Sequence, residues 1–192
     1  MYRSFINRAI SKFGGWRIAT AIIAFSFTIF ISQINELKNA GIFFTLMVCV
    51  SLPLNTFGVG IGKLIAEQNK NLSFGDFVTY SIITIIISFC FAPIIYISFE
   101  EKIIFKTLDL YIILISTSIA VINYLTFQYK NAIIKNFPAA RTHFIQTTIS
   151  VSSASLAAMF IDVPSIWLFC FWSTQIISVI LIEIKFPYHS SK

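Results

Sequence analysis

The sequence is poor in charged residues. Asp, Glu, Lys and Arg make up 11% of its 192 residues, whereas hydrophobic residues make up 57%. Soluble domains carry roughly 25% charged residues, and so few charges could not cover the surface of a globule of this size in water. The shortage therefore excludes an ordinary soluble domain and indicates that lipid is the solvent for most of the surface.

Cysteine and histidine are also scarce. Cys49, Cys90 and Cys170 each lie inside a long apolar run, and none belongs to a Cys-x-x-Cys or Cys/His cluster. This placement indicates free thiols rather than a disulfide framework or a metal centre. His143 and His189 have no carboxylate or cysteine at ligand spacing, so we expect neither a metal nor another cofactor.

No acid falls inside the apolar runs, and catalytic motifs are missing. The sequence has no Gly-x-Ser-x-Gly elbow and no His-Glu-x-x-His helix, so we do not expect an enzyme. Gly58–Lys63 superficially resembles a nucleotide loop, but Phe57 and Leu64 stand where a P-loop needs Gly and Ser or Thr. The pair Gly58 and Gly62 instead predicts close packing of two helices.

Six apolar runs remain, and every acid and base lies outside them. A spanning helix needs about 20 apolar residues, because a rise of about 1.5 Å per residue must cover a core about 30 Å thick. We therefore predict an all-α fold, a six-helix transmembrane bundle that forms one lobe over residues 1–192. The charge-free runs are Ile18–Asn35, Asn39–Gly62, Phe77–Phe99, Leu110–Tyr129, His143–Ile161 and Val163–Ile182. The expected spans lie at about 17–35, 39–62, 77–99, 110–129, 142–161 and 164–183. Pro53 and Pro93 fall inside the second and third spans, where neighbouring helices can accommodate a kink.

Residues 1–15 alternate apolar and basic side chains at helical spacing. This pattern predicts a short amphipathic helix that lies on the inner leaflet of the membrane. Gly14-Gly15 would then allow a sharp bend into the first span, with Trp16 as an interfacial anchor. The alternative, a cleaved signal peptide, lacks a small-x-small cleavage site after the apolar run.

Lys and Arg are divided unevenly between alternate connections. Eleven of them lie in the N-terminal segment, the second and fourth connections and the C-terminal tail, against three on the other side. Short cytoplasmic loops carry an excess of bases, so we expect both termini in the cytoplasm. The bases sit in short connections and form no basic domain, so nucleic acid is not an expected partner.

The candidate binding residues are polar side chains within or beside the spans. Arg17 and Arg141, at the inner ends of the first and fifth spans, either anchor the helix by snorkelling or recognise an anionic head group. In the fifth span Thr148, Ser152 and Ser155 share a face, which fits either small-residue packing or the wall of a hydrated cavity. The candidate substrate-binding residues are Arg17, Asn55, Asn123, Arg141 and Gln146.

The stretch from Asn7 to Glu67 has a distinctive order of features. A basic amphipathic start and a first span lead to Asn39-Ala40-Gly41-Ile42-Phe43-Phe44-Thr45-Leu46, and then to a glycine-rich end, Phe57–Glu67, with a basic connection after it. In this order the stretch resembles the N-terminal part of polysaccharide (O-antigen-type) flippases, which belong to the multidrug/oligosaccharidyl-lipid/polysaccharide exporter superfamily. The later spans match this family in number, spacing and orientation.

The resemblance implies a protein of the bacterial inner (plasma) membrane, with two six-helix lobes around a central cavity. It implies alternating access for a lipid-linked oligosaccharide, such as an undecaprenyl-pyrophosphate-linked O-antigen unit. Cavities of this family are often cationic, and Arg17 is a candidate for that role. Because family members have at least twice as many spans, this chain would be a single lobe that acts with a second lobe or as a homodimer. The alternative is a small six-span scaffold or channel-like subunit, with membrane lipids as its partners and no flippase activity.

The expected orientation can be tested with topology reporters. Fusions after Lys70, Lys135 and Lys192 should report the cytoplasm, and fusions after Lys38 and Lys106 should report the outside, because the bases divide in this way. Paired alkaline phosphatase and fluorescent-protein fusions give complementary readouts at each site. An outside signal after Lys135 would contradict the six-span arrangement.

Overall fold

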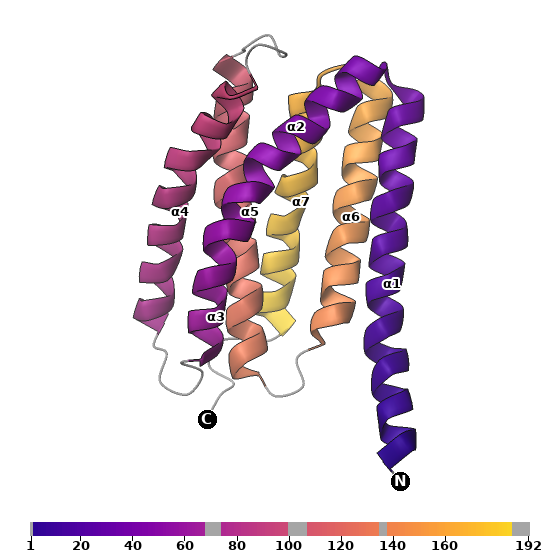
Figure 1. Cartoon of the computed structure of the whole chain (residues 1–192), viewed down its shortest axis with the longest axis vertical. Helices are drawn as coiled ribbons and strands as arrows, with labels where there is room; N and C mark the ends of the chain where they lie inside the picture. Colours follow the sequence, from indigo (N-terminus) through magenta and orange to yellow (C-terminus); the bar gives the residue numbers. More distant parts are fainter. Residues whose placement is uncertain (1, 68–73, 100–106, 135–137, 186–192) are drawn as a thin grey trace.

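A computed structural model describes residues 2–67, 74–99, 107–134 and 138–185. Within these ranges the protein is built from helices and contains no strand, so the predicted all-α fold is confirmed (Figure 1). The elements are α1 (Tyr2–Ile34), α2 (Leu37–Pro53), the π-helix η1 (Leu54–Gly58), α3 (Val59–Glu67), α4 (Phe74–Ile97), α5 (Thr107–Ile133), α6 (Ala139–Phe160) and α7 (Pro164–Lys185).

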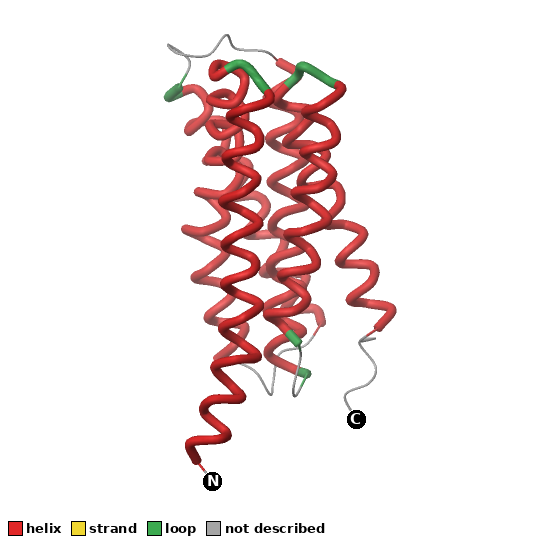
Figure 2. The backbone as a smooth tube through the Cα atoms, turned by 90° about the vertical axis from the view of Figure 1, so that its right-hand side faces the viewer, coloured by secondary structure: helices red, strands yellow, loops and turns green. Residues whose placement is uncertain are grey.

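The helices form an elongated bundle of antiparallel columns, in which α2, η1 and α3 together make a single column (Figures 1 and 2). The start of α1 and the end of α7 lie at the same end of the bundle, which we call the terminal end. The α1–α2 and α6–α7 connections lie at the opposite end. This alternation matches the predicted order of spans.

Five segments are long and apolar enough to cross a membrane, and they make the chain a multi-pass membrane protein. The fifth expected span, 142–161, forms α6, which is long enough but too polar to meet the same criterion. Nevertheless, α6 lies in the bundle beside α1 and α7 (Figure 1). Its polarity is therefore tolerated through contact with protein rather than with lipid. The five apolar segments are Gly15–Ile34, Leu37–Leu64, Gly75–Ile97, Thr107–Ala132 and Pro164–Ile182.

The outer surface of the bundle is apolar. Phe25 of α1 is 68% exposed, and Ile94 of α4 is 58% exposed, although both are large hydrophobic residues. Monomeric soluble proteins rarely expose contiguous apolar patches larger than a few hundred Å², whereas a lipid-facing surface requires them.

Helix α1 packs chiefly on α6, although the two helices lie far apart in the sequence. It makes few contacts with α2, the helix that follows it directly.

An aromatic cluster fills the half of the bundle nearer the opposite end. It consists of Phe27 from α1, Phe43 from α2, and Trp167, Phe171 and Trp172 from α7. The Phe43 ring lies 5.7 Å from that of Phe27 and 5.9 Å from that of Trp167, and the Phe171 and Trp172 rings are 5.2 Å apart. These distances suit edge-to-face and tilted ring pairs. The cluster therefore ties α1, α2 and α7 together and closes this half of the bundle.

The two prolines inside the spans have different effects. Pro53 ends α2 and is followed directly by the wide π turn of η1, whereas α4 continues as an α-helix through Pro93. A helical proline removes a backbone donor and crowds the carbonyl four residues earlier. A π turn is one way to absorb such a disturbance, and such turns often occur at functional sites.

The expected bend at Gly14-Gly15 is wrong, because α1 runs without interruption from Tyr2 to Ile34 (Figure 1). Glycine weakens a helix by about 1 kcal/mol per residue but does not block it sterically as proline does. The basic start of the sequence thus continues the first span. The side chains of residues 2–14, on which the predicted surface-bound face depends, lie outside the described part of the structure.

Gly58 and Gly62 pack against α5, as the Gly-x-x-x-Gly spacing predicts. A Cβ atom added to Gly62 would lie 3.2 Å from both Gln128 Cγ and the Tyr124 hydroxyl. At Gly58 it would lie 3.4 Å from the Tyr124 ring and 3.0 Å from Leu54. Gly60, between them, faces open space, with no heavy atom within 4 Å. The absence of a side chain at Gly58 and Gly62 therefore permits the close approach of the α2–α3 column to α5.

The Gly62→Leu variant should lower stability by about 1–3 kcal/mol, because the new side chain overpacks the contact with Tyr124 and Gln128. Gly60→Leu is the matched control and should leave stability unchanged or slightly raised, since it adds helix propensity without a clash. Thermal unfolding in detergent measures both. Equal midpoints for the two variants would contradict this packing.

Candidate functional site

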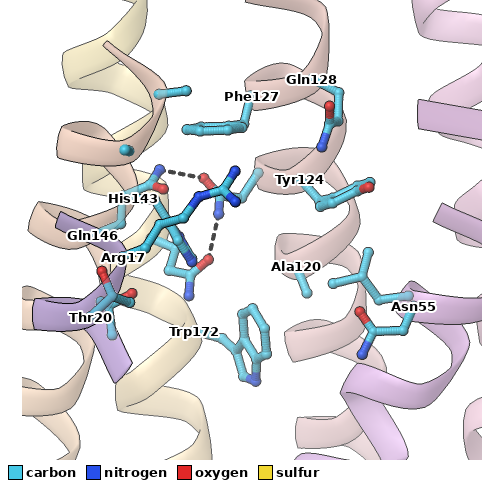
Figure 3. A pocket seen from close by; sticks show the side chains of 16 residues that line it. Arg17, Thr20, Asn55, Ala120, Tyr124, Phe127, Gln128, His143, Gln146 and Trp172 are labelled. Carbon is cyan, nitrogen blue, oxygen red and sulfur yellow. Dashed lines mark hydrogen bonds between the residues drawn. The ribbon is translucent and has the colours of Figure 1, made fainter. Parts of the chain in front are cut away.

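A cavity of about 430 Å³ lies between α1, α6 and α7 on one side and η1 and α5 on the other. Helix α4 contributes nothing to it among the described residues. Side chains from five elements reach the cavity, and most of them are polar or aromatic (Figure 3). The polar and aromatic lining residues are Arg17, Thr20, Asn55, Asn123, Tyr124, Phe127, Gln128, His143, Gln146, Thr147, Trp172 and Gln175.

A chain of three side-chain amides connects α6, α5 and α7 along the cavity wall. Gln146 Nε2 donates a hydrogen bond of 2.9 Å to Asn123 Oδ1, and Asn123 Nδ2 donates one of 2.5 Å to Gln175 Oε1 (Figure 3). All three residues are more than nine-tenths buried. Each amide has further donors or acceptors, and because all three residues line the cavity, those atoms form part of its wall.

Arg17 brings positive charge to the cavity. It lies near the terminal-end limit of the apolar segment Gly15–Ile34, and its guanidinium group reaches toward the amide chain beside His143 (Figure 3). Among the described lining residues there is no Asp or Glu. Because the guanidinium group is cationic and no acid among these residues offsets it, the cavity favours an anion.

Aromatic side chains complete the cavity. Tyr124 and Phe127 project from α5, and Trp172 lies at the end of the cavity away from Phe127 (Figure 3). Trp172 also belongs to the aromatic cluster, which therefore closes the cavity toward the opposite end of the bundle. Its buried indole N–H has no hydrogen-bond partner among the described residues, a cost of about 1–3 kcal/mol for a buried donor.

Four of the five candidate residues from the sequence meet in this cavity: Arg17, Asn55, Asn123 and Gln146. Asn55 enters from η1, so the wide turn after Pro53 helps to form the wall. The fifth candidate, Arg141, instead lines a separate groove between α6 and α7. The structure therefore brings four of the candidates together and places Arg141 apart from them.

The sequence analysis did not identify His143 and Trp172 as lining residues. It considered His143 only as a metal ligand and as the start of the charge-free run His143–Ile161. A periodic signal was nevertheless present, since His143, Gln146 and Thr147 follow i, i+3, i+4 spacing on α6, and Trp172 and Gln175 are three residues apart on α7.

The predicted face of Thr148, Ser152 and Ser155 does not line the cavity. None of the three residues is buried, and Ser152 is exposed. The packed face of α6 instead includes Ser150 and Ala154, both fully inaccessible, on a helix that packs against α7 and α1. Small-residue packing therefore occurs on this helix, but on a different face from the predicted one. Among the described residues, no group of three His, Cys, Asp or Glu side chains could hold a metal ion.

Asn123→Ala should destabilise the protein by about 1–2 kcal/mol, because it leaves the buried Gln146 and Gln175 amides without their shared partner. Asn55→Ala, at the exposed asparagine of the same cavity, is the control and should change stability by less than about 0.5 kcal/mol. Reversible unfolding in mixed micelles gives both values. A loss for Asn123→Ala as small as that of the control would rule out a structural role for the amide chain.

No protein-family model matches the chain, no curated protein matches it, and no solved structure matches it. The conclusions about its chemistry therefore rest on the chain's own geometry: a charged, amide-lined and aromatic cavity enclosed by apolar helices.

Proposed function

We propose that this chain is part of a flippase or exporter that moves a lipid-linked oligosaccharide across the bacterial inner membrane by alternating access. The observation that carries the proposal is the cavity itself. A positively charged, hydrogen-bonding space of about 430 Å³ lies within a bundle whose outer surface is apolar. Polar groups at membrane depth are costly and commonly mark a substrate pathway.

The lining chemistry suits an anionic head group that carries sugars. A guanidinium fork can form paired hydrogen bonds with a phosphate or pyrophosphate, and Arg17 places one in the cavity. The amides of Asn123, Gln146 and Gln175 offer donors and acceptors for hydroxyl groups, and the Trp172 ring offers an apolar face. An undecaprenyl-pyrophosphate-linked glycan carries a pyrophosphate, sugar hydroxyl groups and apolar surface, and it therefore matches each kind of lining side chain.

The closure of the bundle is also compatible with alternating access. The aromatic cluster fills the half of the bundle nearer the opposite end, and there Asn39 Nδ2 donates to Asp162 Oδ1, joining the start of α2 to the α6–α7 connection. The cavity instead lies toward the terminal end. With the termini in the cytoplasm, as the distribution of bases predicts, this arrangement would correspond to a state open to the inside.

A second lobe or a second copy of the chain would complete the translocation path. The cavity is bounded by α1 on one side and by η1 and α5 on the other, and α1 makes no extensive contact with α3. One side of the cavity would thus face lipid in an isolated lobe. Covering it with protein avoids the cost of exposing the amides and Arg17 to hydrocarbon.

Replacement of Arg17 tests the proposal. In a strain whose glycan export depends on this chain, Arg17→Gln should lower export at least tenfold, because a charge-assisted hydrogen bond is worth about 1.5–3 kcal/mol. Arg17→Lys, which keeps the charge but loses the fork, should retain part of the export. Surface glycan is measured by immunoblot at matched levels of membrane protein.

Lys63→Gln is the control for charge, since Lys63 is an exposed base near the terminal end of α3 and does not line the cavity. Its export should equal that of the wild type. Full export by Arg17→Gln, at wild-type abundance, would contradict the flippase proposal. That result would favour the alternative, a membrane scaffold or channel-like subunit.

A further inference from the structure

A second groove, of about 330 Å³, opens between α6 and α7. It lies beside the ends of these helices at the terminal end of the bundle, and it contains Arg141, which the central cavity does not use. Gln146 lines both spaces, so its side chain separates the groove from the cavity. The chemistry of the groove differs from that of the cavity, because aliphatic rather than amide side chains dominate it.

Two bases from different helices meet at this groove. Arg141 lies in the first turn of α6, and Lys185 is the last residue of α7. Both side chains are exposed. Because they come from neighbouring antiparallel helices, an anion between them would contact both and would join the two helix ends.

The position of Arg141 is electrostatically unfavourable for the helix alone. The start of a helix carries a partial positive charge and favours acids, yet the first turn of α6 contains no acid and does contain this arginine. The helix also lacks a side-chain cap, because its N-cap residue is Pro138. The first-turn N–H groups and the guanidinium thus present like charge, which an external anion would neutralise.

Aliphatic side chains lie one turn deeper on both helices. Ile145 follows Arg141 by four residues on α6, and Leu181 precedes Lys185 by four residues on α7. Both line the groove and are partly exposed, at 43% and 51%. Side chains four residues apart share a helix face, so each wall carries a base at the rim and an aliphatic residue nearer the middle of the membrane.

We propose that this groove binds an anionic phospholipid from the leaflet at the terminal end. Its phosphate lies between Arg141 and Lys185 at the start of α6, and an acyl chain runs along Ile145 and Leu181. Basic pockets between membrane helices bind anionic head groups in this way. The paired rows of charge and aliphatic surface match a phospholipid better than a free anion, which would leave the aliphatic walls uncovered. This site is independent of the translocation proposed for the cavity.

Lipid binding to the purified, delipidated full chain tests the proposal. In a neutral detergent, phosphatidylglycerol should remain bound in native mass spectra and should raise the unfolding midpoint, whereas phosphatidylcholine with the same acyl chains should do neither. Inorganic phosphate alone should leave the midpoint unchanged. An equal response to the two lipids, or a full response to inorganic phosphate, would overturn the proposal.

Charge variants locate the site. Arg141→Gln and Lys185→Gln should each weaken phosphatidylglycerol binding about fivefold, the effect of removing one base near a lipid surface. Arg141→Lys should retain most of the affinity. The control is Lys63→Gln, an exposed base on α3 outside the groove, which should bind as the wild type does.

The same variants distinguish binding in the groove from a general attraction of anionic lipid to the basic surface. They also show whether a loss of binding results from misfolding. If Lys63→Gln weakens binding as much as Arg141→Gln does, the attraction belongs to the whole basic surface and the groove proposal is wrong. If Arg141→Gln does not fold, Lys185→Gln gives the decisive measurement, because this exposed base ends its helix. An unchanged affinity of a folded Lys185→Gln variant for phosphatidylglycerol would also overturn the proposed site.

Discussion

The absence of water from the core of a bilayer is the constraint on which this structure depends. Each backbone polar group must be paired within the protein, which leaves helices as the way for this chain to cross. Many hydroxyl groups are paired within their own helix in the same way; Thr84 and Thr117, for example, donate to the carbonyls of Tyr80 and Ile113 four residues earlier. Amides have no such local solution. Asn123, Gln146 and Gln175 therefore pair with one another across three helices, and the cavity forms where they meet.

The interior is packed tightly in one half of the bundle and loosely in the other. Toward the opposite end, the aromatic cluster and small residues of α6 fill the interior tightly. Toward the terminal end, polar side chains of several sizes leave space, and the π turn after Pro53 brings Asn55 to its edge. The hydrogen bond from Asn39, at the start of α2, to Asp162 in the α6–α7 connection lies at the tightly packed end. Any separation of the helices would therefore meet least resistance at the terminal end.

The number, type and approximate bounds of the helices followed from the sequence, because charge is excluded so strictly from a spanning helix. The predicted span 110–129, for example, forms the central part of α5 (Thr107–Ile133). The bend at Gly14-Gly15 was wrong because, in a helix otherwise favoured by its surroundings, two glycines weaken but do not interrupt the hydrogen bonding. The fifth span was harder to judge from composition, since α6 is polar and owes its place to contacts with α1 and α7.

The candidate site was only partly visible in the sequence. Isolated amides in apolar runs are costly, which singled out Asn55 and Asn123. Arg141 and His143 are two residues apart and therefore point to nearly opposite sides of α6, so that His143 lines the cavity and Arg141 lines the groove. His143 and Gln146 are only three residues apart and share a face. Which faces of different helices meet depends on their relative rotation, and a single sequence does not encode that in any short motif.

The pairing of α1 with α6 has a consequence for biogenesis. α1 is synthesised before the other helices of this bundle, yet its main packing partner begins only at Ala139. At roughly 5–20 residues per second, α1 waits on the order of ten seconds in the membrane before α6 is made. During that interval Trp16 lacks Phe144, whose ring lies 4.9 Å away in the folded protein. Synthesis thus separates the insertion of α1 from its assembly, because the packing of α1 on α6 can form only after α6 has been made.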